Sequence, residues 1–294
     1  MKSIKRIPKS ELILNSDGSV YHLHLLPTDI ATDIITVGDP DRVPEVSKYF
    51  DKIEVKKQKR EIVTHTGYYK GKRMTVISTG MGTDNIDIVF NELDALVNID
   101  LKERCVKENL TSLNLIRIGT SGTVQAALDV DTHLVSEFGV GLDGLGGFYS
   151  FENTEEEKVI KDAVTTLLLA DQLGVQPYVC KVSQKLYDSV NFDIFNGITV
   201  SNAGFYGPQG RTLRLTPKSV NFVDKLAGID IQGRKITNLE METSAMYMMA
   251  KALGHHAISF NALLANRATG NFTKDAAKTV ESLIQKVLDW TLTL

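Results

Sequence analysis

The sequence is poor in cysteine, and its only two cysteines, Cys105 and Cys180, lie far apart in a spacing that no common metal site uses. Such a pair predicts neither a zinc centre nor a framework of disulfide bonds. Isolated thiols are typical of proteins from a reducing compartment, so we expect a cytoplasmic location. We also expect no bound metal ion.

The sequence also lacks a strong excess of charge and any long hydrophobic run. Its formal net charge is -3 at pH 7, whereas binding to nucleic acid or to anionic membranes needs a concentrated basic surface. A membrane-spanning helix needs about 18 or more consecutive apolar residues, and the sequence contains no such run. The apolar run at 12–14 is too short for a signal-peptide core. We therefore expect neither nucleic acid nor a membrane as a partner.

Several familiar nucleotide and hydrolase motifs are missing as well. There is no Gly-x-x-x-x-Gly-Lys-Ser/Thr loop, and Gly80-Met81-Gly82 is followed by Asn85 where a dinucleotide-binding fingerprint needs a third glycine. The sequence contains no Gly-x-Ser-x-Gly elbow and no His-Glu-x-x-His pair. Binding of ATP or NAD, serine hydrolysis and zinc-dependent proteolysis therefore have no motif here.

What is present is a chain long enough for a large core, with 294 residues of which 43% are hydrophobic. Short apolar runs alternate with longer segments of helical spacing, a pattern typical of α/β proteins. Predicted strands cover residues 33–37, 52–63, 68–72, 74–79, 113–118, 132–137, 178–182, 197–201 and 257–264, and predicted helices cover 85–98, 154–173, 243–253 and 273–294. We expect a single-domain, three-layer α/β/α fold with a central mixed, largely parallel sheet, formed by residues 21–294 after an N-terminal arm of residues 1–20.

Two carboxylates precede the most regular of these helices. Glu240 and Glu242 flank Met241 just before the apolar segment 243–253, which is followed by Gly254. If this lead-in is extended, the alternation of side chains makes the two glutamates point the same way. Ionised carboxylates only accept hydrogen bonds, so such a pair suits the two hydroxyl donors of a ribose. The alternative is that both acids merely complement the positive start of a helix.

Two glycine turns at predicted strand ends each carry an arginine. Gly38 is followed by Arg42 in the first turn of the next predicted helix, whose free N–H groups suit an anion. Arg117 precedes a second such turn, in which Thr120 and Ser121 add hydroxyl donors. Arginine can hold a phosphate through two bonds, so the two turns together predict a phosphate site. The alternative is helix capping at the first turn and a structural ion pair at Arg117.

A third cluster lies in the segment 205–211, Phe-Tyr-Gly-Pro-Gln-Gly-Arg. The ring of Phe205 can stack on a planar heterocycle, and the Gln209 amide offers both a donor and an acceptor, as the edge of a pyrimidine does. Arg211 would stabilise charge on such a base. The alternative is a solvent-exposed loop without a ligand.

Together these motifs resemble those of a known family. They are Val-Gly-Asp-Pro-Asp-Arg-Val at 37–43, Ser-Thr-Gly-Met-Gly at 78–82, Arg-Ile-Gly-Thr-Ser-Gly at 117–122, the segment 205–211, Glu-Met-Glu at 240–242 and Asn-Arg at 266–267. In this order and spacing the sequence resembles the uridine phosphorylase family of the type-I nucleoside phosphorylase superfamily, over about residues 21–290. The resemblance implies a glycosyltransferase of pyrimidine salvage that converts uridine and phosphate to uracil and ribose 1-phosphate.

The resemblance also implies roles for individual residues. Phosphate would be held by Gly38, Arg42, Arg117 and Thr120, with Arg60 donated by a neighbouring subunit. Ribose would be bound by Glu240, Met241 and Glu242, and by His22 from a neighbour, with His24 as the alternative histidine. Uracil would be recognised by Phe205, Gln209 and Arg211, with Arg267 supporting Arg211. The residues acting in catalysis would be Arg117, Gln209, Arg211 and Glu242.

Residues donated by a neighbour imply an oligomer, either a homodimer or a homohexamer with active sites shared between subunits. The resemblance implies no cofactor, because inorganic phosphate is a co-substrate. Some members of the family bind a monovalent cation at a dimer interface, at positions that match Glu61, Met81 and Asn85. Asn85 stands where the family pattern has serine, which argues against a cation here.

Other functions compete with this interpretation. A purine nucleoside phosphorylase or a nucleosidase of the same superfamily would carry an aspartate shortly after the strand that follows the carboxylate pair, but residues 262–267 contain no acid. A glycosidase needs carboxyls about 5 Å or more apart across the bond, which neighbouring residues on one face do not provide. A non-catalytic nucleoside-binding protein would not need the phosphate residues, although fold alone does not fix function.

Overall fold

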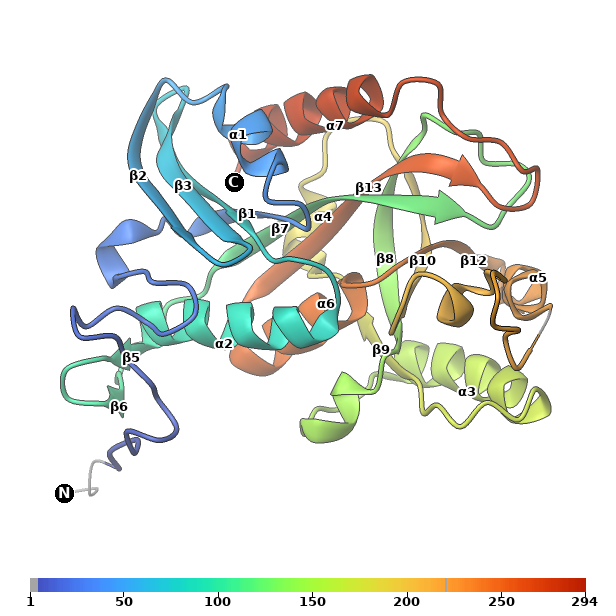
Figure 1. Ribbon diagram of the computed structural model, residues 1–294, viewed down its shortest axis with the longest axis horizontal. Coiled ribbons are helices and arrows are strands. Elements are labelled where there is room, and N and C mark those ends of the chain that lie inside the picture. The colour runs from blue at the N-terminus through green and yellow to red at the C-terminus, as the bar shows by residue number, and fades with distance from the viewer. Residues whose placement is uncertain (1–4, 220) are drawn as a thin grey trace.

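The computed structural model describes residues 5–219 and 221–294, whose strands form one large central sheet (Figure 1). Its strands are β1 (Asp33–Val37), β2 (Lys52–Lys59), β3 (Ile62–Tyr69), β4 (Lys72–Ser78), β7 (Asn114–Thr123), β8 (His133–Leu142), β9 (Tyr178–Lys181), β10 (Phe195–Asn202), β11 (Asp230–Ile231), β12 (Arg234–Glu240) and β13 (His256–Asn266). They lie in the order β11-β12-β10-β8-β13-β7-β1-β4-β3-β2, with β9 beside β8. A separate small sheet joins β5 (Ile99–Asp100) to β6 (Cys105–Val106).

The sheet is mixed, as predicted. Strand β1 runs parallel to β4 and β7, β7 runs parallel to β13, and β10 runs parallel to β8 and β12. Antiparallel pairs form the β2-β3-β4 edge and also join β13 to β8. Because β12 pairs with β7 as well, the strands β7, β13, β8, β10 and β12 close into a ring.

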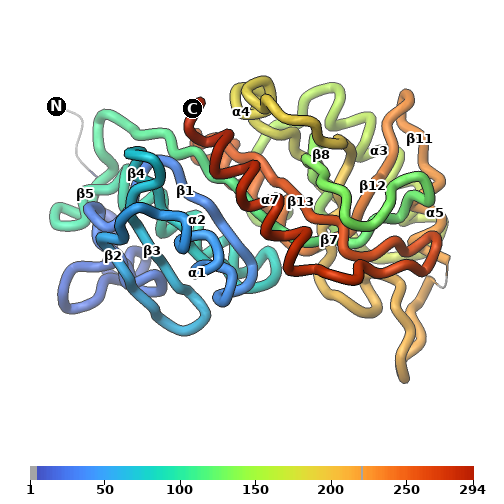
Figure 2. Tube along the Cα trace, turned by 90° about the horizontal axis from the view of Figure 1, so that it is seen from above, coloured from blue at the N-terminus to red at the C-terminus, as the bar shows by residue number. Residues whose placement is uncertain are grey.

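Helices cover both faces of the sheet, which gives the three layers that the sequence predicts (Figure 1). The helices α1 (Arg42–Ser47) and α7 (Ala276–Thr291) lie on one side, and α2 (Thr83–Asn98) and α6 (Thr243–Leu253) lie on the other. Figure 2 shows α7 running along β13 and β7. The remaining helices and turns are α3 (Glu155–Ala170), α4 (Gln184–Asp188), α5 (Phe222–Gly228), η1 (Pro27–Asp29), η2 (Leu145–Phe148) and η3 (Gly207–Gln209). No helix in the described part of the chain is long and apolar enough to cross a membrane.

The burial of β1 and α6 shows where the core lies. Every residue of β1 is buried, as expected for a strand covered on both faces. Helix α6 buries all its residues up to Ala250 and ends at Gly254, whose φ of +79° is in the left-handed region that glycine favours. The prediction of a buried helix over 243–253 is confirmed, with Glu240 at the end of β12 and Glu242 at the start of α6.

Two glycine-rich segments, one of them the predicted turn after Arg117, are partly strand in the structure. Strand β7 continues through residues 119–122, because its backbone pairs with β13 and then with β12. Strand β8 extends to Leu142, into the glycine-rich segment of residues 139–147. A Cβ on Gly139 would lie 2.9 Å from the Cα of Ser244. Gly139 therefore allows the backbones of β8 and α6 to pack closely.

The described part of the N-terminal arm, residues 5–20, packs on the rest of the chain. Leu12 and Val20 are buried, and Arg104 donates hydrogen bonds to the carbonyl oxygens of Ile7, Pro8 and Leu12. Residues 1–4 of the predicted arm lie outside the described residues. The boundary between an arm and a domain at residue 20 stays a prediction.

Candidate active site

Arg117 lies at the centre of a buried ionic cluster. Its side chain on β7 is 5% exposed, and its Nη2 lies 2.7 Å from Oε2 of Glu242 and 3.0 Å from Oε2 of Glu240. Its Nη1 donates to Oδ1 of Asn261 at 3.0 Å. Burial by itself would lower the pKa of Arg117, but the two carboxylates outweigh burial and raise that pKa. Arg117 is therefore a fixed positive charge within the site.

The carboxylate of Glu240 accepts most of its hydrogen bonds from the start of α6 and from Ser201. Its carboxylate accepts hydrogen bonds from the backbone N–H of Glu242 at 2.9 Å, from that of Thr243 at 3.0 Å and from the Ser201 hydroxyl. These are the bonds of an acid at a helix start, the alternative that the sequence leaves open. Glu240 therefore both contacts Arg117 and caps the start of α6. Its role toward ribose stays a prediction.

Glu242 keeps more of its bonding capacity. Its Oε1 accepts the backbone N–H of Gly82 at 2.7 Å, and its Oε2 accepts Nη2 of Arg117. Each carboxylate oxygen has a further lone pair, so a ligand hydroxyl can still donate to Glu242. Burial raises the pKa of Glu242, and the charge of Arg117 opposes that rise. Met241, between the two glutamates, is partly exposed.

Arg42, from the first of the two predicted glycine turns, lies close to Arg117. Nη1 of Arg42 lies 3.4 Å from the carbonyl oxygen of Ile118, the residue that follows Arg117 on β7. Burial, and then the positive charge of Arg117, lowers the pKa of Arg42. Gly38, which follows β1, and Thr120, which lies within β7, are partly exposed. Two guanidinium groups that repel each other in one partly buried site favour an anion bound between them.

The segment between β10 and α5 folds around Arg211. This arginine donates to Oε1 of Gln209 at 2.7 Å and to the carbonyl oxygen of Phe205, and its guanidinium carbon lies 3.7 Å from the centre of the Phe205 ring. Arg267 donates to the carbonyl oxygen of Gln209 at 3.0 Å. Burial, and then the charge of Arg267, lowers the pKa of Arg211 to about 10. The four residues predicted to recognise the base are therefore brought together, and Arg211 is charged at neutral pH.

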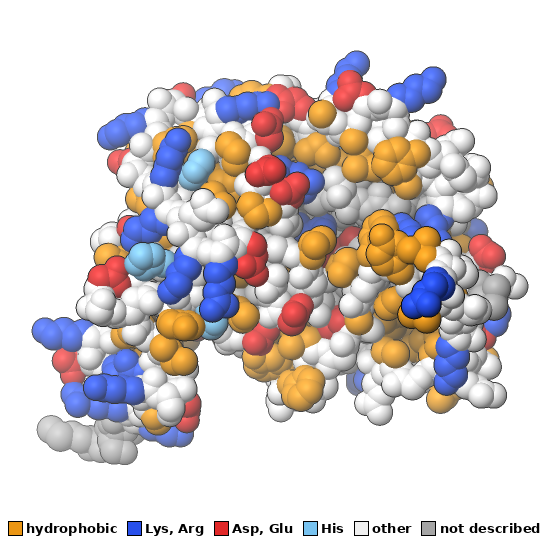
Figure 3. Space-filling view, in the orientation of Figure 1, with side chains coloured by type: hydrophobic (Ala, Val, Ile, Leu, Met, Phe, Trp, Pro, Cys, Tyr) orange, Lys and Arg blue, Asp and Glu red, His pale blue; other side chains and the backbone are white. Residues whose placement is uncertain are grey.

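This segment presents an apolar surface around a buried amide. Gln209 is only 3% exposed, whereas Phe205 and Tyr206 are about half exposed and Leu213 and Leu215 are more exposed still. Figure 3 shows hydrophobic side chains gathered over this part of the face. Such a surface suits a flat, weakly polar ring.

The two residues predicted to reach a neighbouring subunit are not bonded to this cluster in the described chain. Arg60 is exposed at the turn between β2 and β3 and has a φ of +55°. That turn divides the single strand predicted for residues 52–63. Nδ1 of His22 lies 2.6 Å from Oε1 of Glu92, which also accepts the backbone N–H of His22. Nε2 of His24 lies 3.2 Å from Oδ2 of Asp17, away from this cluster.

The positions that match the family's cation site lie close together. Nδ2 of Asn85 donates to the carbonyl oxygen of Met81 at 3.3 Å, and a Cβ on Gly80 would meet side-chain atoms of both Asn85 and Glu61. Within the described residues, no group of three or more His, Cys, Asp or Glu could hold a metal ion.

A polar cluster at the start of α6, around Ser244, was not predicted from the sequence. The carboxylate of Asp143 accepts hydrogen bonds from the Tyr178 hydroxyl at 2.9 Å, from the Ser244 hydroxyl at 3.2 Å and from the backbone N–H of Leu145 at 2.8 Å. Burial raises the pKa of Asp143 despite these bonds. The only signal in the sequence was an aspartate before a glycine, which indicates a turn and nothing more.

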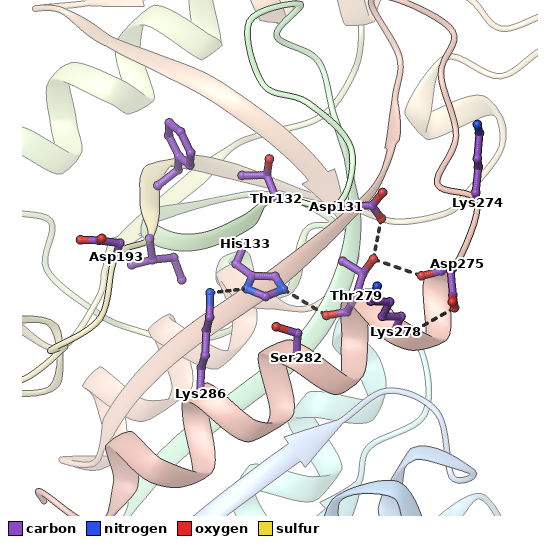
Figure 4. A pocket seen from close by; sticks show the side chains of 12 residues that line it. Asp131, Thr132, His133, Asp193, Lys274, Asp275, Lys278, Thr279, Ser282 and Lys286 are labelled. Carbon is purple, nitrogen blue, oxygen red and sulfur yellow. Dashed lines mark hydrogen bonds between the residues drawn. The ribbon is translucent and has the colours of Figure 1, made fainter.

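A cavity of about 770 Å³ lies elsewhere in the molecule (Figure 4). It is lined by the start of α7 and by the segments that lead into β8 and β10, and Lys286 points at His133 within it. Strands β8 and β10 lead to Asp143 and Ser201 at their other ends, so this cavity lies at the opposite end of those strands from the ionic cluster. None of the predicted site residues lines it.

The chain is similar to known proteins along most of its length. Residues 32–292 match the family model described as the phosphorylase superfamily. A uridine phosphorylase of Thermococcus kodakarensis is 29% identical to the chain, covering 98% of it and 93% of the relative. A uridine phosphorylase of Haemophilus influenzae is 28% identical, covering 92% of the chain and 96% of the relative.

Solved structures share the fold. The crystal structure of a Trypanosoma brucei nucleoside phosphorylase, described as showing uridine phosphorylase activity, has a TM-score of 0.88 at 28% identity and covers 96% of this chain and 100% of that one. A Toxoplasma gondii purine nucleoside phosphorylase has the same fold, with a TM-score of 0.67 at 19% identity, covering 96% of both chains. Because the family model spans most of its length, the chain belongs to the phosphorylase superfamily.

Proposed function

We propose that this protein catalyses the phosphorolysis of uridine to uracil and ribose 1-phosphate. Relatives that carry the name or the activity of a uridine phosphorylase over nearly the whole chain support this substrate. The observation that carries the proposal is the 2.7 Å contact between Arg117 and Glu242. It places a residue assigned to phosphate beside a residue assigned to ribose, as attack of phosphate on the sugar requires.

Residues are assigned to the two reacting groups as follows. Phosphate is bound by Gly38, Arg42, Arg117 and Thr120, with Arg60 from a neighbouring subunit. Arg117 uses Nη1 and Nη2 for protein contacts, and its Nε makes no hydrogen bond among the described residues, so Nε is the donor left for phosphate. Ribose is bound by Glu240, Met241 and Glu242, with His22 from a neighbouring subunit. Of the glutamates, Glu242 has the freer oxygens.

The base is assigned to Phe205, Gln209, Arg211 and Arg267. Because Oε1 of Gln209 accepts from Arg211, the amide nitrogen of Gln209 is left to donate to a carbonyl oxygen of uracil. Arg211 contributes positive charge, and Arg267 fixes the backbone of Gln209. A purine enzyme would need an acid near residues 262–267, and that stretch has none.

The reaction needs no covalent nucleophile. Phosphate attacks C1′ of the nucleoside while the N-glycosidic bond breaks, and the electron pair of that bond leaves with uracil. The phosphate dianion stabilises the positive charge that develops on the sugar. Gln209 and Arg211 stabilise the negative charge on the leaving base, which is where preorganised donors lower a barrier most.

The proposal includes an oligomer, because Arg60 and His22 are assigned to a neighbour's site. A homodimer is the smallest assembly that satisfies this, and a homohexamer of dimers satisfies it too. Phosphate acts as a co-substrate, and the reaction as written uses no cofactor. A cytoplasmic location stays a prediction.

The proposal is tested by measuring base release from uridine, with inosine in parallel, in the presence and absence of phosphate. We expect release of uracil only when phosphate is added, and little release of hypoxanthine. Release of uracil without phosphate would point to a hydrolase. Tight uridine binding without release in phosphate would point to a non-catalytic binding protein.

A further inference from the structure

Four polar side chains are fully buried inside the ring of strands, and none of them has a role in the proposed reaction. Ser136, Thr199, Asn238 and Asn261 each have an exposed fraction of 0%. They come from β8, β10, β12 and β13, four of the five strands that close the ring. Buried polar groups destabilise a fold unless they are hydrogen-bonded, so these four side chains need hydrogen-bond partners inside the protein.

These side chains form a continuous chain of hydrogen bonds that begins at Arg117. Asn261 Oδ1 accepts from Arg117, and its Nδ2 lies 3.2 Å from the Ser136 oxygen. The hydroxyls of Ser136 and Thr199 are 2.6 Å apart, and that of Thr199 lies 2.8 Å from Oδ1 of Asn238. The chain crosses the strands in the order in which they pair.

The chain returns to β7, the strand on which it started. Nδ2 of Asn238 donates to the hydroxyl oxygen of Ser121 at 2.9 Å, and β12 pairs with β7 at this point. Ser121 is partly exposed, unlike the four residues before it. The two ends of the chain, Arg117 and Ser121, therefore both lie in the Arg-Ile-Gly-Thr-Ser-Gly motif.

With the amide groups of Asn261 and Asn238 oriented as in this structure, the bonds of the chain all run in one direction. Arginine can only donate, so Asn261 accepts through its oxygen and donates through its nitrogen. Thr199 gives its one hydrogen to the oxygen of Asn238, so the hydrogen between the two hydroxyls comes from Ser136. Asn238 donates to Ser121, which leaves the hydrogen of the Ser121 hydroxyl without a partner among the described residues. Bonds that all run one way strengthen one another.

We propose that this chain, which we call the polar belt, is a positioning device for the phosphate site. It holds the guanidinium of Arg117 at one end, and at the other it turns the Ser121 hydroxyl so that its hydrogen is donated to a phosphate oxygen. Ser121 is thereby a further substrate-binding residue. The inference rests on the proposed function, because it takes phosphate as the anion of this site.

Thr199→Val is the sharpest test, because valine keeps the shape of threonine but removes the hydroxyl that links the two halves of the belt. We expect the KM for phosphate to rise about tenfold, as for the loss of one bond to a charged ligand, while the KM for uridine changes less than twofold. Thr199→Ser restores the hydroxyl and should restore the KM for phosphate.

Thr64→Val is the matched control. Thr64 is also a buried strand threonine, but its hydroxyl has no hydrogen-bond partner and lies outside the belt. Its substitution should leave both KM values unchanged. If Thr199→Val does not fold, Ser121→Ala tests the same end of the belt at a partly exposed position, with the same expected rise in the KM for phosphate.

The outcomes separate the two proposals. A wild-type protein without phosphate-dependent uracil release overturns the proposed function itself. An active wild type, with Thr199→Val and Ser121→Ala that keep the wild-type KM for phosphate, overturns the belt and leaves the function standing. An equal rise in the KM for both substrates would mean a general loss of structure, and it too would contradict a specific positioning role.

Discussion

Arg117 can reach its two glutamates only because residue 119 has no side chain. The guanidinium folds back over the backbone of β7, where a Cβ on Gly119 would lie 1.9 Å from Nη1 of Arg117. The conflict is with the group that pairs with Glu242, so a side chain at residue 119 would displace the centre of the proposed site.

We expect Gly119→Ala to lower kcat/KM by about 100-fold, since a displacement of about 1 Å in a reacting group has an effect of that order. Steady-state kinetics with both substrates will measure it. Gly228→Ala is the control, because a Cβ there would meet no atom within 4 Å. Equal activity of both variants would mean that the position of Arg117 is unimportant.

Arg211 is the residue whose substitution bears most directly on the leaving base. Removing a donor aimed at developing charge costs about 3 to 4 kcal/mol, so we expect Arg211→Ala to lower kcat by about two to three orders of magnitude. Arg214→Ala removes an exposed arginine from the same segment and should be neutral. Turnover of Arg211→Ala close to wild type would contradict the assigned role.

At the scale of elements, the sequence predicts helices and buried strands well but misjudges glycine. Helix α6 shows its apolar periodicity and its terminal glycine plainly, and the prediction is right. The glycines after Arg117 have the composition of a turn, yet they continue β7, because the decisive contacts come from β12 and β13, which are distant in sequence. Local composition cannot show how closely a distant backbone approaches.

Asp143 joins three elements that meet at the start of α6. It bonds the start of η2 through Leu145, β9 through Tyr178 and the start of α6 through Ser244. No local pattern could reveal it, because its partners are contributed by other elements. Its carboxylate links them, and burial raises its pKa in the folded state.

This shift predicts a pH dependence of stability for Asp143→Asn. As the pH rises from the unfolded value of about 3.9 toward the raised folded pKa, the unfolded chain releases this proton first, so ionisation favours unfolding. The asparagine variant has no such loss, so its free energy of unfolding should rise relative to wild type across that window and then stay level.

Urea unfolding at several pH values between about 3 and 7 covers this window, beginning below the unfolded pKa. Asp129→Asn removes an exposed aspartate without an ion pair among the described residues and serves as the control. A difference between Asp143→Asn and wild type that does not change with pH would mean that burial does not govern this carboxyl.

At the scale of the whole molecule, the sequence predicts the layers but not the ring of strands. Alternating strands and helices indicate a parallel sheet, and most strand pairs in the middle of the sheet are parallel, although β8 and β13 pair antiparallel. The closure of β12 onto β7 depends on an antiparallel pair between distant segments, which no periodicity encodes. The polar belt follows from that closure, so its four buried members, Ser136, Thr199, Asn238 and Asn261, could not be singled out beforehand, although its two ends, Arg117 and Ser121, were.

The placement of Arg60 sets up a prediction about the assembly. Arg60 is exposed at the tip of the β2-β3 hairpin, whereas Arg117 is buried in its own subunit. If a site combines Arg117 of one chain with Arg60 of another, then Arg60→Ala and Arg117→Ala each weaken every site of a pure assembly. A mixed dimer has one site with both defects and one site with neither.

Co-expressed, differently tagged Arg60→Ala and Arg117→Ala chains should therefore regain activity, with about half of the sites in a mixed dimer intact. Phosphate-dependent uracil release by the doubly purified mixed assembly measures this. A mixture of the two separately purified variants is the control, since intact dimers that do not exchange subunits contain no complete site. Only a site shared between subunits can be rebuilt from two defective chains. If the mixed assemblies are no more active than that control, Arg60 does not contribute to the site of a neighbouring subunit.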